Sequence, residues 1–205
     1  MHHCIARYDM AGAILAHLMV GVDLHPKVDP VAAHIAPLPQ AQFFPPGVTP
    51  AHMGMGPTAY VYTPASCTRK GPGGSKNRST NTTAAALRRT QRDAAERGTV
   101  AETEKDKEDG DEDAECKIHV VYHGCNSSVQ APGGLSIVKY AGYNGWAESN
   151  KLIIIYPQSL GSTCWDWTGA TIPGNANADY DTRDGIQTGT VNRMVDYVAA
   201  GMHRG

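Results

Sequence analysis

The chain has 205 residues, a formal net charge of −2 and 41% hydrophobic residues, which allows one domain with a sizeable core but not two full ones. The small net charge excludes a global field for nucleic acid or anionic membrane, and no apolar run approaches the ~20 residues that cross a bilayer. The apolar run 13–20 is short, is interrupted by His17 and lacks a convincing cleavage site, so we predict no signal peptide.

Residues 1–67 are predicted to form an N-terminal helix, a meandering connection and a first strand. The helix is indicated by apolar residues at i, i+3, i+4 and i+7. They are Ala11, Ile14, Leu15 and Leu18. The connection, 23–58, is rich in proline and glycine. Residues 59–63 then predict a strand that ends at Pro64.

Residues 68–115 differ from the rest of the chain. Basic residues fill the first half of this segment and acidic residues fill its end, with almost no large apolar side chains. Such a segment cannot bury enough surface to offset its chain entropy. We therefore predict a disordered charged insertion in a surface loop, with a basic–acidic interaction tail as the alternative.

Residues 116–205 predict a βαβ arrangement. The stretch 116–125 alternates β-branched and polar residues before a His-Gly-Cys exit, where glycine would let the backbone turn sharply. A helix with a break near Gly142 is predicted at 136–148, and a strand buried on both faces at 152–156. After a polar loop at 157–183, the spacing of apolar residues predicts a helix over 184–202. The fold class is therefore α/β, a partial sheet of about three strands with flanking helices.

The sequence contains no complete nucleophile elbow of the Gly-x-Ser-x-Gly type. The stretches around Ser75 and Ser136 begin correctly but lack the last glycine. Ser75 falls in the charged insertion, and Ser136 is predicted to be a helix N-cap. Ser127 and Ser128 follow His-Gly-Cys and are expected to cap a turn.

Histidine and cysteine patterns give no metal signature. No pair of the nine histidines has the i, i+4 spacing with an intervening Glu that a helical zinc site needs, and the five cysteines form no CxxC. No metal or cofactor is therefore predicted. His119 is expected to be a satisfied core residue on its strand, and His123 to shape the turn before Gly124.

Two tryptophans in a polar loop leave two interpretations open. Trp165 and Trp167 in Cys164-Trp165-Asp166-Trp167 can form a small satellite core or an aromatic binding surface. The spacing alone favours neither.

Taken together, several motifs resemble the C-terminal half of polyhydroxybutyrate (PHB) depolymerases, serine esterases of the α/β-hydrolase class. A strand ending in His-Gly-small is how α/β-hydrolases present a backbone N–H for an oxyanion hole. The matching segments, in chain order, are 8–15, 60–67, 116–125, 142–150, 154–158 and 164–167. Family members of this kind are circularly permuted, with serine, aspartate and histidine preceding the helix that resembles Tyr8–Leu18. The resemblance therefore transfers no triad residue to this chain.

The resemblance does imply several roles for residues that are present. The backbone N–H of Cys125 would be one oxyanion donor, with His123 shaping the turn, and Trp165 and Trp167 would line the polyester-binding face. It also implies two disulfides within this chain, with the partner of Cys4 in the missing half. They are Cys125–Cys164 and Cys67–Cys116, the second closing the base of the insertion.

Three hypotheses follow from these residues. The first is part of a carboxylic-ester hydrolase acting on PHB or similar esters, inactive alone, with the triad on a missing N-terminal half or a second polypeptide. The second is a non-catalytic module that binds polyester or another apolar surface, and the third is an inactive, poorly folded fragment. The implied disulfides predict an extracellular or otherwise oxidising compartment.

Overall fold

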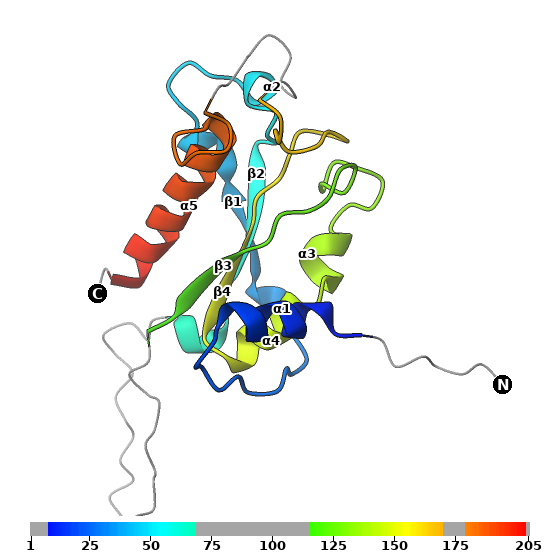
Figure 1. Cartoon of the computed structure of the whole chain (residues 1–205), viewed down its shortest axis with the longest axis vertical. Helices are drawn as coiled ribbons and strands as arrows, with labels where there is room; N and C mark the ends of the chain where they lie inside the picture. The colour runs from blue at the N-terminus through cyan, green and yellow to red at the C-terminus, as the bar shows by residue number, and fades with distance from the viewer. Residues whose placement is uncertain (1–7, 69–114, 170–178, 204–205) are drawn as a thin grey trace, which may run out of the picture. The chain divides into compact units, whose positions relative to one another are not determined.

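The structure, a computed structural model, describes residues 8–68, 115–169 and 179–203 (Figure 1). Most of the predicted insertion at 68–115 therefore lies outside the described residues, as do Cys4 and Ser75. Its two ends meet in the described part of the chain, because Cys67 and Cys116 form a disulfide with a Cα–Cα distance of 5.9 Å. The chain between them leaves and re-enters the fold at one place, as an insertion does.

Within the described residues, four strands form one mixed sheet in the order β1-β2-β4-β3. Pairing is antiparallel between β1 and β2 and between β2 and β4, and parallel between β3 and β4. The strands are β1 (Ile35–Pro39), β2 (Thr58–Tyr62), β3 (Lys117–Val120) and β4 (Leu152–Tyr156).

The sheet is the middle of three layers, because its buried side chains alternate between two faces. Ile153 and Ile155 of β4 pack with Val191 and Met194 of α5 (Ile186–His203) on one face. Leu152 and Ile154 of β4 belong to the cluster on the opposite face. That cluster includes residues of α1 (Met10–Leu18) and α4 (Tyr143–Ser149). Figure 1 shows α5 on one side of the strands and α1 and α4 on the other.

The predicted βαβ unit is present. The crossover from β3 to the parallel β4 runs through α3 (Ser136–Tyr140) and α4, and the predicted break falls at Gly142, whose φ is +93°. A residue with a side chain rarely adopts that backbone conformation, so a glycine is favoured between the two helices. The fully buried strand 152–156 is also confirmed.

Three sequence predictions need correction. The connection 23–58 contains a strand, β1, and a short helix, α2 (Pro50–Met53). The C-terminal helix begins at Ile186 rather than at Asp184. Ser136 is the first residue of α3 and not its N-cap, since Leu135 occupies that position and no side chain caps the helix. The Ser136 hydroxyl instead donates back to the carbonyl of Gly133.

This mixed four-stranded sheet with flanking helices is a partial α/β-hydrolase-like fold. The remaining short elements are the 3₁₀ helices η1 (Ala32–His34), η2 (Gln40–Phe43) and η3 (Ala65–Cys67). None of the helices in the described ranges has the length and apolar character that a membrane crossing requires.

Candidate active-site turn

The candidate site lies where the two parallel strands end. The carboxyl ends of parallel strands lie at the same edge of a sheet, so the turn after β3 meets the loop after β4. The N–H of Val121 still donates to Ile155 (2.9 Å), which keeps the chain against β4 just beyond β3. The next residues leave the sheet and form the turn. We call residues 123–126 the oxyanion turn, after the role that the resemblance implies for them.

The turn falls one or two residues later than the sequence predicts. Gly124 is not among the residues with positive φ, and the left-handed residue is Asn126, with φ +58°. Asparagine is one of the few residues other than glycine that adopt this conformation routinely. A Cβ added at Gly124 would meet nothing within 4 Å. The space beside Gly124 is therefore open, and the chain reverses at Asn126 rather than at the glycine.

The backbone N–H of Cys125 is the candidate donor. Cys125 is exposed, and its N–H has no hydrogen-bond partner among the described residues. An N–H without a partner, on an exposed residue of a fixed turn, is available to an oxygen that approaches from outside.

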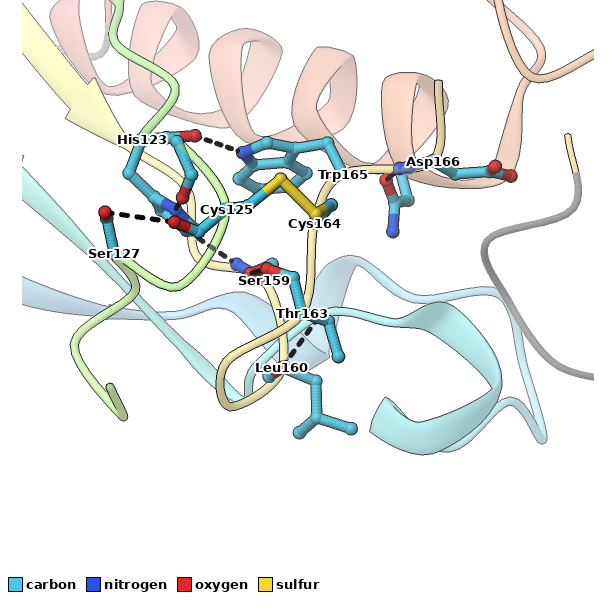
Figure 2. The surroundings of a disulfide bond; sticks show 11 residues. His123, Cys125, Ser127, Ser159, Leu160, Thr163, Cys164, Trp165 and Asp166 are labelled. Carbon is cyan, nitrogen blue, oxygen red and sulfur yellow. Dashed lines mark hydrogen bonds between the residues drawn. A yellow bond between two sulfur atoms is a disulfide. The ribbon is translucent and has the colours of Figure 1, made fainter. Parts of the chain in front are cut away.

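His123 fixes the turn from beneath. Its side chain is buried, with 4% exposure, and both ring nitrogens are used (Figure 2). Nδ1 donates to the carbonyl of Gly124 (2.7 Å), and Nε2 accepts from the N–H of Ser159 (3.0 Å). This pattern requires the neutral tautomer with its proton on Nδ1.

The surroundings of His123 favour the same neutral form. Burial lowers its pKa below the ordinary value, and the bond to Gly124 opposes this shift without reversing it. A ring held in this way has no free nitrogen to accept a substrate proton. The contacts therefore fit a residue that shapes the turn.

A disulfide is the second tether. Cys125 is bonded to Cys164, and their Cα atoms lie 4.3 Å apart. Both pairings implied by the resemblance are thus present in the structure. Figure 2 shows the disulfide between the oxyanion turn and the chain segment that carries Ser159, Thr163 and Trp165.

The two tryptophans occupy different environments. The indole N–H of Trp165 donates to the carbonyl of His123 (2.9 Å), and its ring lies edge-on to Tyr122 at 5.0 Å. Trp165 is partly buried against the core cluster on the α5 face. Trp167 is 71% exposed. Trp165 supports the turn, whereas Trp167 presents its ring to solvent.

The other predicted candidates are not brought to this turn as catalytic groups. Ser127 donates to the Cys125 carbonyl (3.2 Å), and Ser128 is fully buried with its hydroxyl donating to Gly161. The ring of His119 contacts the ring of Tyr143 in a tilted arrangement, with centroids 5.2 Å apart, and burial lowers the pKa of His119. Across the described ranges, no group of three His, Cys, Asp or Glu residues could hold a metal ion.

Sequence reasoning missed the polar residues that follow β4. Gln158 is buried and accepts from the N–H of Val129 (2.8 Å), while its own N–H donates to Gln40 (3.0 Å). Ser159 is fully buried and holds His123. A glutamine and a serine that follow a fully buried strand after a single proline were the available signal, because buried polar groups must find partners.

Comparisons with known proteins place these features in a family context. No protein-family model matches the chain. Over 91 residues, 43% of its length, the chain is 36% identical to a poly(3-hydroxybutyrate) depolymerase of Delftia acidovorans. Over 102 residues, 42% of its length, it is 30% identical to a polyhydroxybutyrate depolymerase of Talaromyces funiculosus. The chain spans only 17% and 28% of the length of these two relatives.

Two solved structures of PHB depolymerases are similar to this chain in fold. A PHB depolymerase complexed with R3HB trimer is similar with a TM-score of 0.52, and the PHB depolymerase from Penicillium funiculosum with a TM-score of 0.51. Each match has 22% identity and covers 92% of this chain but 47% of the other. At this identity the likeness establishes the fold, and the chain corresponds to about half of each solved protein.

Proposed function

Because the chain is PHB depolymerase-like over its matched part, we propose that it supplies one oxyanion donor and an aromatic substrate surface to a carboxylic-ester hydrolase. In the proposed reaction, a serine outside this sequence attacks the ester carbonyl of a hydroxyacid polymer. Negative charge then develops on the carbonyl oxygen, and the N–H of Cys125 donates to it. One such donor contributes roughly 10²–10³ in rate.

The observation that carries this proposal is that Cys125, an exposed residue on a turn with several tethers, has an N–H without a partner in the described part of the chain. The tethers are the ring of His123, the disulfide to Cys164 and the indole of Trp165 bonded to the His123 carbonyl. A donor that is already held in place costs no reorganisation when the charge develops. Three tethers around one exposed donor are more than an ordinary surface turn needs.

The unpaired edge of β3 suggests where the missing triad would lie. Lys117 and Val121 donate their N–H groups to the β4 side, so by alternation Ile118 and Val120 direct theirs away from β4. A strand added in parallel at this edge would end beside the oxyanion turn. A nucleophile on the loop after that strand would then face the Cys125 N–H. We therefore propose as partner a segment of a longer protein, or a second polypeptide, that carries serine, aspartate and histidine.

Trp167 and Trp165 are the proposed contacts for the polymer. Aromatic faces suit the apolar parts of a polyester, and the exposed ring of Trp167 is free to take this role. The same exposure favours the second candidate function, a binding module without catalysis. The two functions differ in whether ester is cleaved when a triad is supplied.

An assay of ester cleavage tests the catalytic proposal. The purified chain is mixed with the part of the Talaromyces funiculosus depolymerase that it does not match, and hydrolysis of a nitrophenyl butyrate is followed. We expect neither part to cleave the ester alone and the mixture to cleave it. A mixture that forms a complex but stays inactive would contradict the enzyme proposal.

Binding to polymer tests the second function. Sedimentation with PHB granules should retain the wild-type chain and release Trp167→Ala, which should still fold because Trp167 is 71% exposed. Exposed Tyr140→Ala is the matched control and should stay bound. Equal retention of all three proteins would exclude Trp167 as a contact. A broad, non-cooperative thermal melt would instead favour the inactive fragment.

The two disulfides fit an extracellular location for the protein. Disulfides persist in oxidising compartments and are rare in the reducing cytosol. A polymer substrate too large to enter a cell would also be met outside it.

A further inference from the structure

A signal for N-glycosylation begins one residue after Cys125. Asn126-Ser127-Ser128 fits the pattern Asn-x-Ser/Thr with x other than proline. The pattern alone is common and many copies are never modified. The structure adds two independent observations at this copy.

First, the acceptor side chain is presented to solvent. Asn126 is exposed and left-handed, with φ +58°. Its side chain makes no hydrogen bond with any residue in the described ranges, unlike Asn144 and Asn150, whose amides are bonded to backbone carbonyls. A sugar on Asn126 Nδ2 would therefore extend into solvent without displacing a contact.

Second, the signal is accessible only before the fold closes. The hydroxyl of Ser128, the third residue of the signal, is fully buried in the folded chain. It donates to the carbonyl of Gly161 and accepts from the N–H of Gln130 (3.2 Å). The disulfide from Cys125 to Cys164 closes the same two segments on each other. A transferase that must bind this hydroxyl can do so only on the unfolded chain.

We propose that Asn126 is N-glycosylated during secretion, before the segment 159–164 closes over Ser128. The donor is a lipid diphosphate-linked oligosaccharide. The amide Nδ2 of Asn126 bonds to the anomeric carbon of the sugar, and the bond from that carbon to the diphosphate oxygen breaks. The amide loses one proton and the lipid diphosphate leaves, so nothing is oxidised or reduced. This modification does not depend on the proposed esterase function.

Translation with secretory microsomes tests the proposal on the full chain behind a secretory leader. Tryptic peptides are analysed by mass spectrometry before and after peptide N-glycosidase, which converts a glycosylated asparagine to aspartate. We expect this conversion at Asn126. Two further signals, at Asn77 and Asn81, lie outside the described residues and report whether the chain met the transferase. Modification of Asn77 or Asn81 without modification of Asn126 overturns the proposal. Removal of the leader shows that the chain entered the microsomes, so an entirely unmodified chain without its leader also overturns it.

Matched variants separate the signal from the fold. Asn126→Gly keeps the left-handed turn and should lose one glycan, whereas Ser128→Thr keeps the signal and should retain it. A reductant that prevents the Cys125–Cys164 disulfide should raise occupancy at Asn126, because the signal stays open longer. Occupancy that is unchanged or lower under reduction would overturn the proposed timing. The comparison of the two variants does not require the chain to reach its native fold.

Discussion

The two outer strands of the described sheet, β1 and β3, are built in opposite ways. Both pair with a neighbour on one side only. An unpaired strand edge carries a row of N–H and C=O groups that can bind another strand. The sequence of each strand decides whether its edge is blocked or available.

The edge of β1 is blocked by proline. The N–H of Thr63 donates to the carbonyl of His34, so alternation directs Ala36 and Leu38 toward β2 as well. The outward positions are then Ile35, Pro37 and Pro39. Two of these three residues have no N–H to offer, as expected for a strand that ends a sheet.

The edge of β3 has no such protection. Its outward residues, Ile118 and Val120, both carry an N–H, and neither is charged or proline. The oxyanion turn follows at the end of this strand. The comparison indicates that the sheet terminates at β1 and is suited to continue at β3, toward the proposed triad.

The largest expected effect comes from blocking the β3 edge. Val120→Pro removes an outward N–H that makes no bond to β4, so the chain should still fold. A strand added at this edge would lose its partner and clash with the proline ring. Ester hydrolysis in the mixing assay should fall to background, with the fold checked by circular dichroism.

Val120→Thr is the control for this change, because it has a similar shape and keeps the N–H. It should retain most of the activity of the mixture. If the Val120→Pro chain folds and is as active in the mixture as wild type, the triad-bearing segment does not pair with the edge of β3.

A smaller effect is expected from releasing the start of β3. Cys67→Ala with Cys116→Ala removes a disulfide that spans 49 residues of sequence. Loop closure of that length is worth about 4 kcal/mol of unfolding free energy. Urea unfolding measures the loss, and hydrogen exchange locates it.

Exchange should distinguish the two edges. The N–H of Lys117, bonded to Lys151 (3.0 Å), should exchange faster without the disulfide, while the N–H of Leu38 on β1 should change little. Equal acceleration at both strands would show that β3 has no special dependence on its covalent anchor.

Removing the ring beneath the oxyanion turn should cost less. His123→Ala leaves the fully buried N–H of Ser159 without its acceptor, at about 1–3 kcal/mol. Urea unfolding again gives the value. His25→Ala, an exposed histidine, should fall within about 0.5 kcal/mol of wild type. If His123→Ala loses no more unfolding free energy than His25→Ala, the His123 ring does not hold the turn.

The same ring predicts a dependence of stability on pH. Burial lowers the pKa of His123 and of His119 in the folded chain, so the unfolded chain binds protons first as the pH falls. Their contribution is complete above about pH 6.5 and is lost as the pH falls below it. The unfolding free energy should drop as the pH falls from about 6.5 toward 5.5. The slope should be shallower in His123→Ala, and an identical slope would contradict this origin.

The contrast between the edges also shows what the sequence could and could not predict. The apolar run of β4 and the break at Gly142 were visible because they follow from local burial and glycine geometry. β1 was missed because Pro37 and Pro39 hide a strand pattern, although prolines on an edge strand are compatible with pairing on its other side.

At the site, local sequence indicated the residues but not their contacts. His-Gly-Cys marked the turn, yet the partner of His123 is Ser159, 36 residues away in sequence. Trp165 and Trp167 are two residues apart and equally aromatic. Only tertiary packing decides that Trp165 is half-buried against the turn and Trp167 exposed.

The smallest expected effect tests the blocked edge. Pro37→Val restores an outward N–H on β1 and should change the unfolding free energy by no more than about 1 kcal/mol, mainly through the unfolded chain. Its consequence should appear in association, because the opened edge can pair with a second copy. Sedimentation velocity at rising concentration should show oligomers for Pro37→Val. Ala36→Val adds a similar exposed side chain on a residue whose backbone faces β2, and should remain like wild type. If both variants stay monomeric like wild type, Pro37 is not what prevents pairing at the edge of β1. The contrast with β3 must then come from the side chains around the β1 edge.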